Sequence, residues 1–416
     1  MFWSAFLVSL FSSSVGRTII IPILERLRIY DVPNHRTVHA KPILGMGGLI
    51  FITGYFSSLL YILYYQSPLF NDQLLTSLIA ILGGGISIII LGAVDDLINL
   101  KPLTKFSVEC VVGLFLCQCG IIIEELNILG VSWSLGTLAI PFTILWIVGI
   151  INAMNMMDGL DGLSGSISLV ILTAMAIHQP DHPLVQLLFP GLIGGIIVFL
   201  FDNWHPAKIF MGDIGSLFLG YHIAVFSILI LSFNATPMGA MAPILLLGLP
   251  IIDTLWAMVR RAQLKKPIFQ ADKLHIHHQL LALGMAHKKV VITLFLVSLL
   301  LAILTYWGIN SDLTNSKIIS LGSLLVISYL VFHLYTIKHI QEAAETKGYR
   351  TGIKDTIREY LIVKRYGKNK IDKARKIKDS ESKILIKKVN EIFSQEDSPR
   401  LPELSDAFFK DADDEQ

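Results

Sequence analysis

Residues 74–96, LLTSLIAILGGGISIIILGAVDD, form an apolar run that ends in two adjacent aspartates. Residues 74–94 are long enough to cross roughly 30 Å of hydrocarbon as an α-helix. Asp95 and Asp96 mark the point where this helix leaves the hydrocarbon, because carboxylates are expensive to dehydrate. The stretch therefore predicts a membrane-spanning helix that carries a polar group at one end.

The same pattern recurs along the chain, whose 416 residues are 53% hydrophobic and only 16% charged. This composition is typical of membrane proteins rather than of soluble domains. Further apolar runs cover residues 2–24, 44–65, 106–123, 137–153, 162–178, 184–201, 214–233, 238–258, 289–309 and 317–337. We therefore expect an all-α polytopic membrane protein with about eleven transmembrane helices.

Basic residues are distributed unevenly between the gaps that separate these runs. The gaps after the odd-numbered runs hold fourteen lysines and arginines, whereas only Lys317 borders an even-numbered gap. By the positive-inside rule, the odd-numbered gaps are cytoplasmic, the N-terminus lies outside and the C-terminus lies in the cytoplasm. The apolar start of the chain lacks a basic leader or a cleavage site, which predicts a retained helix.

The composition changes at Lys338, and 18 of the 34 lysines and arginines lie from this residue to the end of the sequence. We expect a transmembrane catalytic domain over residues 1–337 and a cytoplasmic charged helical tail over residues 338–416. The acidic end of the tail is typical of disordered segments. Two interpretations of the helical part stay open: amphipathic helices that lie on anionic lipid, or a solvated tail without a specific role.

Five of the predicted cytoplasmic gaps carry polar clusters. The first, residues 31–48, contains Lys41 and ends in a glycine-rich entry to a helix. The second is Asp95–Asp96 with Lys105 downstream. Adjacent carboxylates repel each other, and a divalent cation or a cationic partner removes that repulsion. A merely solvated helix end is the less favourable interpretation, because the acids stand at the negative end of the helix dipole.

The third cluster, residues 152–162 (NAMNMMDGLDG), repeats polar side chains every third position at Asn155, Asp158 and Asp161. On an unbroken helix these side chains would drift around the axis and not share one face. Gly159 and Gly162 predict that the helix breaks and that its backbone lines a polar cavity. A metal ion or a polar ligand is the simplest partner for these acids.

The fourth cluster, residues 206–216, contains Phe210 and Asp213 at the start of an apolar run, where Asp213 could also serve as a helix N-cap. The fifth, residues 272–278, contains His275, His277 and His278 and follows Arg261. Three histidines can bind zinc, but the segment lacks cysteines and the usual paired ligand spacing. Together the five clusters suit Mg²⁺-assisted chemistry on a phosphate ester.

In this order the motifs resemble the polyprenyl-phosphate N-acetylhexosamine-1-phosphate transferases of glycosyltransferase family 4. The resemblance runs from about residue 31 to residue 284, and its His-Ile-His-His motif is similar to that of the WecA/TagO branch, which is related to MraY. It implies an MraY/WecA-like helical bundle. It also implies transfer of GlcNAc-1-phosphate from UDP-GlcNAc to undecaprenyl phosphate, which yields undecaprenyl-diphospho-GlcNAc and UMP.

The resemblance also implies roles for the residues in the motifs. Asn155 and Asp213 would hold Mg²⁺, or Mn²⁺ in its place. Asp95 and Asp96 would act near the lipid phosphate, one of them as a base; a covalent aspartyl intermediate is the alternative. Asp161 and His278 complete the expected catalytic group. The expected substrate-binding residues are Lys41, Lys105, Asp158, Phe210 (stacked on uracil), Arg261, His275 and His277.

A bacterial cytoplasmic membrane with the active site on its cytoplasmic face follows from the same resemblance. The lipid bilayer, the two substrates and a second copy of the chain are the expected partners, and nucleic acid is not. Another donor, UDP-MurNAc-pentapeptide or UDP-GalNAc, is the nearest alternative. A membrane transporter is a distant one, because it would place charges deep within the spans rather than at their ends.

Overall fold

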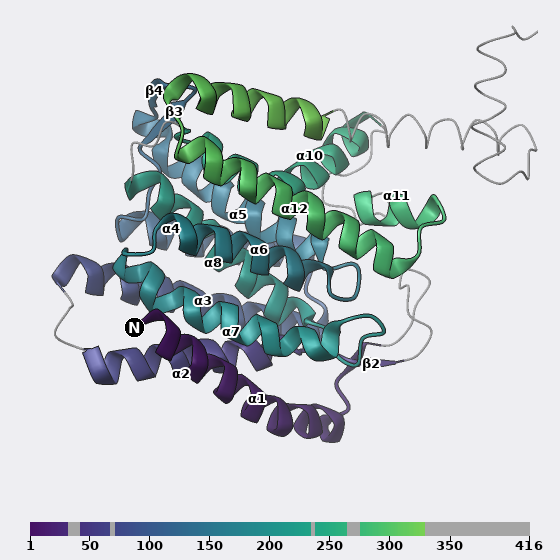
Figure 1. The fold of residues 1–416 in the computed structure, drawn as a ribbon. Helices are drawn as coiled ribbons and strands as arrows, with labels where there is room; N and C mark the ends of the chain where they lie inside the picture. The colour runs from purple at the N-terminus through teal and green to yellow at the C-terminus, as the bar shows by residue number, and fades with distance from the viewer. Residues whose placement is uncertain (32–41, 67–70, 234–237, 264–274, 329–416) are drawn as a thin grey trace, which may run out of the picture. The chain divides into compact units, whose positions relative to one another are not determined.

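The computed structural model describes residues 1–31, 42–66, 71–233, 238–263 and 275–328, and Figure 1 shows their arrangement. The long helices are α1 (Phe2–Leu27), α2 (Gly48–Gln66), α3 (Asp72–Ile98), α4 (Pro102–Gln118), α5 (Ala139–Met157), α6 (Leu163–His178), α7 (Pro183–Asn203), α8 (Gly212–Phe233), α10 (Gly248–Gln263) and α12 (His287–Ile309). Short helices are η2 (Gly136–Leu138), α9 (Met241–Leu246) and α11 (Ile276–Ala282), and residues 313–328 are also helical.

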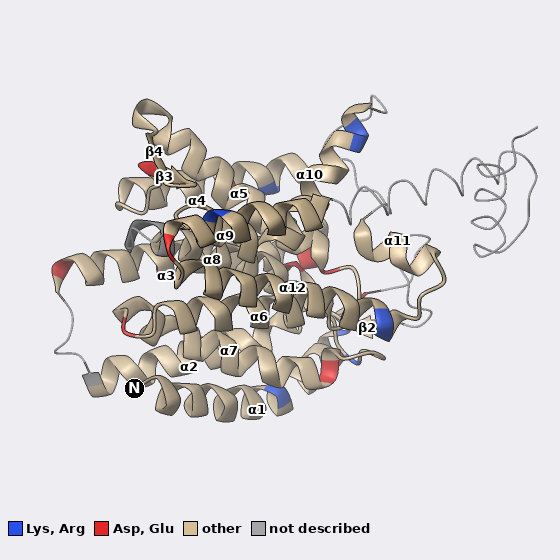
Figure 2. Ribbon diagram, turned by 45° about the horizontal axis from the view of Figure 1, so that its top comes forward, with Lys and Arg blue, Asp and Glu red and all other residues tan. Residues whose placement is uncertain are grey.

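The prediction of an all-α polytopic membrane protein is confirmed. Among the described residues, seven helices are long and apolar enough to cross a membrane, and two shorter apolar helices accompany them. Charged residues are sparse along the bodies of the long helices (Figure 2). Within the described residues, the eleven predicted runs coincide with helices, although the run at 238–258 is divided between α9 and α10 and the last run is described only to residue 328. The number of spans and their orientation stay predictions.

In the described part of the chain, two small antiparallel sheets accompany the helices. β1 (Tyr30–Asp31) pairs with β2 (Ile43–Leu44), and β3 (Glu125–Ile128) pairs with β4 (Val131–Ser134). Leu44 also forms a parallel bridge with Ile209, which lies just before α8. The first sheet therefore connects the entry to α2 with the segment that leads into α8.

The helices pack around a common core. α1, α2 and α7 lie side by side, while α3 and α5 both pack against α8 and α4 lies against α3 and α5 (Figure 1). α8 is deeply enclosed, and its side chains Phe218, Tyr221 and Phe226 are fully buried. A helix that is apolar all round is expected at the centre of a bundle, and α8 occupies that position.

Two glycines bring other helices into backbone contact with the start of α8. A Cβ atom at Gly48 in α2 would lie 2.4 Å from the Cα atom of Gly215, and one at Gly92 in α3 would lie 2.5 Å from the Cα atom of Ile214. Contact at such distances is possible only without a side chain. α2 and α3 are thereby held against the first turn of α8, which carries Asp213.

Candidate active site

A cavity of about 1280 Å³ lies at one end of the bundle. At this end α1, α3, α5 and α7 finish, while α8 and α12 begin. Each of these six helix ends contributes to the lining through a residue at or near the terminus: Glu25, Asp95, Asn155, Asn203, Asp213 and His287. Residues that are far apart in the sequence therefore meet in a single cavity.

The lining of the cavity is strongly acidic. Seven carboxylates line it, whereas Lys208 is the only lysine or arginine among its described lining residues. The carboxylates are Glu25, Asp31, Asp95, Asp96, Asp158, Asp161 and Asp213. Like charges repel strongly where water is partly excluded, so a phosphate ester needs additional cations to bind here.

Lys105 joins two of these carboxylates. Its Nζ atom donates hydrogen bonds to Oδ2 of Asp95 at 2.6 Å and to Oδ2 of Asp213 at 2.7 Å. The other carboxylate oxygen of Asp95 accepts a hydrogen bond from the backbone N–H of Leu100 at 2.6 Å. The ammonium group thus reduces the repulsion between the end of α3 and the start of α8.

Asp96 caps the N-terminus of α8 from a different helix. Its two carboxylate oxygens accept hydrogen bonds from the backbone N–H groups of Asp213, at 2.7 Å, and Ile214, at 3.0 Å. These are N–H groups that an α-helix leaves unpaired in its first turn. The sequence allowed Asp213 to cap its own helix, but Asp213 is the second residue of α8 and Asp96 supplies the cap.

Asn155 and Asp213 face the same space. The hydroxyl of Ser216, one helical turn beyond Asp213, donates a hydrogen bond to Oδ1 of Asn155 at 2.8 Å. This bond holds the end of α5 against the first turns of α8, and both Asn155 and Asp213 line the cavity. An amide oxygen and a carboxylate are the ligand types that suit Mg²⁺, so the residues present fit the predicted metal.

The break predicted between α5 and α6 is present. α5 ends at Met157 and α6 begins at Leu163, and Gly162 between them has a φ of 78°, which favours glycine. Asp158 and Asp161 in this turn both line the cavity. Burial, followed by the nearby charges of Asp213, Asp96 and Asp161, raises the pKa of Asp158 well above its ordinary value.

Asn203 fixes the two segments that flank this part of the cavity. Its side-chain Oδ1 accepts a hydrogen bond from the N–H of Gly162, and its Nδ2 donates to the carbonyl of Ile209, both at 2.9 Å. The next residue, Phe210, donates its N–H to the carbonyl of Leu44 at 2.7 Å. Phe210 is thereby held in the cavity lining.

One histidine of the motif at residues 275–278 lines the cavity, and the other two lie outside its lining. His278 lines the cavity. His275 forms a 2.9 Å hydrogen bond with Asp253, whose other oxygen accepts from the N–H of Ile276 at 2.8 Å, so Asp253 caps α11. His277 is buried against Gly159, and burial lowers its pKa to about 3.

The remaining predicted residues fall outside the lining. Arg261 is buried in α10 and, like His275, His277 and Lys105, is absent from the cavity surface that the described residues form. Lys41 and the predicted tail, residues 338–416, lie outside the described residues.

Sequence reasoning missed Asn203, His205 and His287, which all line the cavity. His205 directly precedes the fourth motif, and His287 begins α12, but neither belongs to a cluster that the sequence makes visible. Asn203 is two residues before His205 at the end of an apolar run. Its position at a helix end was the one available signal.

Comparisons of the sequence with known proteins identify its family. The sequence model of glycosyl transferase family 4 matches residues 78–231. A probable undecaprenyl-phosphate N-acetylglucosaminyl 1-phosphate transferase of Bacillus subtilis is 37% identical over 336 residues, which cover 79% of this chain and 89% of the relative. The chain belongs to the polyprenyl-phosphate N-acetylhexosamine-1-phosphate transferases of glycosyl transferase family 4.

Other members of the family are similar over most of their length. A decaprenyl-phosphate N-acetylglucosaminephosphotransferase of Mycobacterium leprae is 31% identical, over 73% of this chain and 83% of the relative. A phospho-N-acetylmuramoyl-pentapeptide-transferase of Halalkalibacterium halodurans is 30% identical, over 70% of this chain and 91% of the relative. The match to the family model begins within α3 and ends within α8, and so includes Asp95, Asn155 and Asp213.

Proposed function

We propose that this chain transfers GlcNAc-1-phosphate from UDP-GlcNAc to undecaprenyl phosphate and releases UMP. The observation that carries the proposal is the cavity in which Asp95, Asn155 and Asp213 meet at one end of a membrane-embedded bundle. A lipid acceptor and a water-soluble donor can react only where such a bundle borders the aqueous phase. The name of the Bacillus subtilis relative supports the choice of sugar and lipid.

In the proposed reaction, an oxygen of the lipid phosphate attacks the β-phosphorus of UDP-GlcNAc. A new P–O bond forms to the lipid, the bond between the two phosphates of the donor breaks, and UMP leaves with the bonding electrons. Both oxygens of each aspartate accept hydrogen bonds: those of Asp95 from Lys105 and Leu100, and those of Asp96 from the first turn of α8. We assign Asp95 to the attacking phosphate, because its partner Lys105 is a cation that attracts the phosphate, whereas the partners of Asp96 are backbone N–H groups of α8. Asp96 then positions Asp213 rather than touching the substrate.

Lys105 has a second task in this scheme. Its ammonium group already lies within 2.7 Å of a carboxylate oxygen of Asp213 and within 2.6 Å of one of Asp95. Through Asp95 and Asp213, which line the cavity, this ammonium group offsets part of the negative charge that gathers during in-line transfer. Phe210 and the Asp158–Asp161 turn, which Asn203 fixes together, form the wall proposed to receive the nucleoside.

Asn155 and Asp213 are the residues that would hold Mg²⁺. When bound, the ion polarises a phosphoryl oxygen and reduces the charge of the diphosphate. The seven carboxylates of the lining supply an independent reason for a divalent cation, because the described part of the cavity is otherwise strongly acidic. Mn²⁺ has similar ligand preferences and is proposed to substitute.

The proposed setting is the cytoplasmic membrane of a bacterium, with the cavity on the cytoplasmic face. The uneven distribution of basic residues in the sequence supports this orientation. A homodimer is proposed as the assembly by the family resemblance alone.

A UMP-release assay tests the proposal. The purified full chain is incubated in detergent with undecaprenyl phosphate and one donor: UDP-GlcNAc, UDP-GalNAc or UDP-MurNAc-pentapeptide. UMP release with UDP-GlcNAc, lost on addition of EDTA and restored by Mg²⁺, is the expected result. Release with only UDP-MurNAc-pentapeptide would overturn the donor assignment, and unchanged release in EDTA would overturn the role of the metal.

A further inference from the structure

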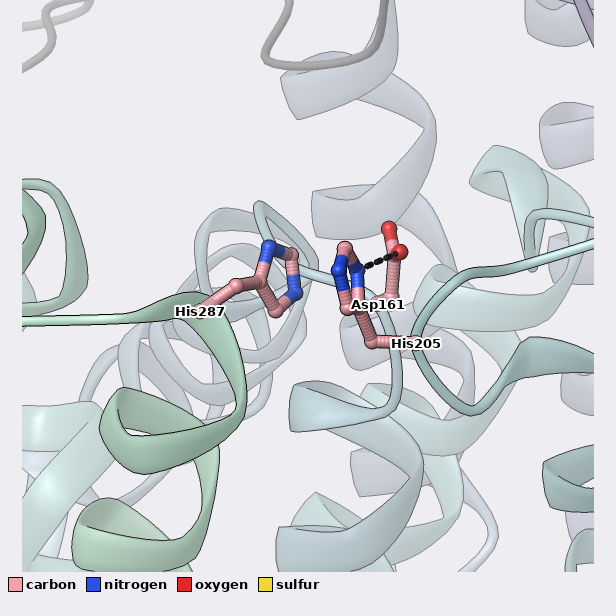
Figure 3. Close-up of side chains that lie close together, drawn as sticks. All are labelled: Asp161, His205 and His287. Carbon is pink, nitrogen blue, oxygen red and sulfur yellow. Dashed lines mark hydrogen bonds and ion pairs between the residues drawn. The ribbon is translucent and has the colours of Figure 1, made fainter.

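A second set of metal-ligand side chains stands at the edge of the cavity, composed of residues other than Asn155 and Asp213. Asp161 comes from the turn between α5 and α6, His205 follows α7, and His287 begins α12. One ligand atom from each of these residues lies within 4.8 Å of the other two. Figure 3 shows the two imidazole rings and the carboxylate grouped together.

Two of the three groups are already in contact. Nδ1 of His205 lies 2.6 Å from Oδ2 of Asp161, and the N–H of Ala207 donates to the same oxygen at 3.1 Å. The ring of His287 stacks on that of His205, with 4.0 Å between centroids and 19° between planes. Nε2 of His287 is buried and has no hydrogen-bond partner among the described residues.

This unpartnered nitrogen is the observation that points to a ligand. A buried imidazole nitrogen without a partner is costly unless a proton donor, a water molecule or a cation satisfies it. The ligands of a tetrahedral zinc ion, with bonds of about 2.0 Å, lie about 3.3 Å apart. The three groups are therefore close enough to reach one ion by side-chain rotation.

We propose that Asp161, His205 and His287 form a binding site for zinc or a similar transition-metal cation. Two imidazoles and one carboxylate suit such an ion, whereas the oxygen ligands of Asn155 and Asp213 suit Mg²⁺. Three protein ligands leave a fourth position for water or a ligand group in the cavity. The two sets of residues thus distinguish two kinds of cation within one cavity.

Zinc at this site inhibits transfer, a consequence that rests on the proposed function. All three side chains line the cavity, and Asp161 belongs to the turn proposed to receive the nucleoside. An ion that binds Asp161 removes this carboxylate from contact with the substrate. Its open position also draws phosphate or water to the cavity edge, away from Asp213.

Metal binding to the purified full chain tests the site directly. After treatment with a chelator, Zn²⁺ is titrated against a chromophoric competitor, and Co²⁺ is used as a spectroscopic probe. One tight equivalent of Zn²⁺ and the absorption bands of tetrahedral Co²⁺ are expected. His205→Gln and His287→Gln should each weaken Zn²⁺ binding by about tenfold or more.

A matched control separates this site from other histidines. His182 caps α7 at its opposite end, so His182→Gln should leave the Zn²⁺ affinity unchanged. Loss of the tight equivalent in His278→Gln, but not in His205→Gln or His287→Gln, would overturn the proposal by placing the ion on the α11 histidines. Absence of tetrahedral Co²⁺ bands from the unmodified protein would also overturn it, whatever the stability of the variants.

The inhibitory consequence has its own measurement. Zn²⁺ should suppress UMP release at constant Mg²⁺, and His287→Gln should require about tenfold more Zn²⁺ for the same suppression. If Zn²⁺ suppressed UMP release equally in the unmodified protein and in His287→Gln, this site would not be the one through which Zn²⁺ inhibits transfer. If the unmodified protein released no UMP at all, the proposed function would fail, while the binding titration would still decide the metal site.

Discussion

Asp96→Ala should weaken the attachment of α8 to the end of α3. The substitution removes both carboxylate oxygens that accept hydrogen bonds from the N–H groups of Asp213 and Ile214. A hydrogen bond to a charged acceptor contributes about 1.5 kcal/mol at the lower end of its range, so the two together amount to about 3 kcal/mol. Asp96→Asn keeps one acceptor oxygen and should lose about half of this value.

Unfolding in mixed micelles of a mild detergent and sodium dodecyl sulfate measures the stability, and UMP release measures the activity. Asp96→Ala should lower both, because the released first turn of α8 no longer fixes Asp213. Asp72→Ala provides the control: Asp72 lies in the first turn of α3, at its other end, and its loss should lower the unfolding free energy by less than about 1 kcal/mol.

A particular combination of results would refute this reasoning. If Asp96→Ala abolished UMP release and left the unfolding free energy within about 0.5 kcal/mol of the unmodified value, its carboxylate would act on the substrate rather than on α8.

Three further predictions concern other contacts of the described structure. Lys105→Met leaves the two carboxylates that Lys105 bridges without their cation. It should lower kcat/KM for UMP release by about 100-fold or more. A loss of less than about threefold would contradict the proposed role of Lys105. Burial lowers the pKa of His277 to about 3, so the folded protein does not bind the proton that this imidazole binds in the unfolded chain below pH 6.5. The free energy of unfolding should therefore fall by roughly 2 kcal/mol between pH 7 and pH 5. His277→Gln should remove this part of the acid sensitivity of unfolding. Gly48→Ala forces a Cβ against Gly215 and should destabilise by about 1–3 kcal/mol, whereas Gly149→Ala, with no atom within 4 Å of the added Cβ, should be neutral in the same unfolding assay.

The helices could be predicted from the sequence because each corresponds to a local run of apolar residues. A run of apolar residues predicts burial in lipid or in the core, and it needs no information from elsewhere in the chain. The break after α5 was equally local, since Gly159 and Gly162 lie within five residues of Met157, the last residue of the helix. The division of the run at 238–258 into α9 and α10 was not foreseen, because its apolar residues continue through the break.

The arrangement of the cavity lining depends on contacts between distant segments, which no local pattern records. The sequence placed Asp95 and Asp96 side by side, but it could not show that Asp96 turns to the backbone of α8 while Asp95 meets Lys105. It likewise could not bring His287 to Asp161. The residue types in the motifs indicated the chemistry, and helix packing decided which of them face the cavity.

The lining extends from Glu25 near the end of α1 to His287 at the start of α12, and this has a consequence for biosynthesis. During co-translational insertion, no partly made chain possesses the full cavity until α12 emerges from the ribosome. A nascent chain that has inserted only through α8 already carries Asp95, Asn155 and Asp213, but it lacks the wall that His287 completes. The cavity is therefore completed late in assembly, because its formation depends on the integration of α12 into the bundle.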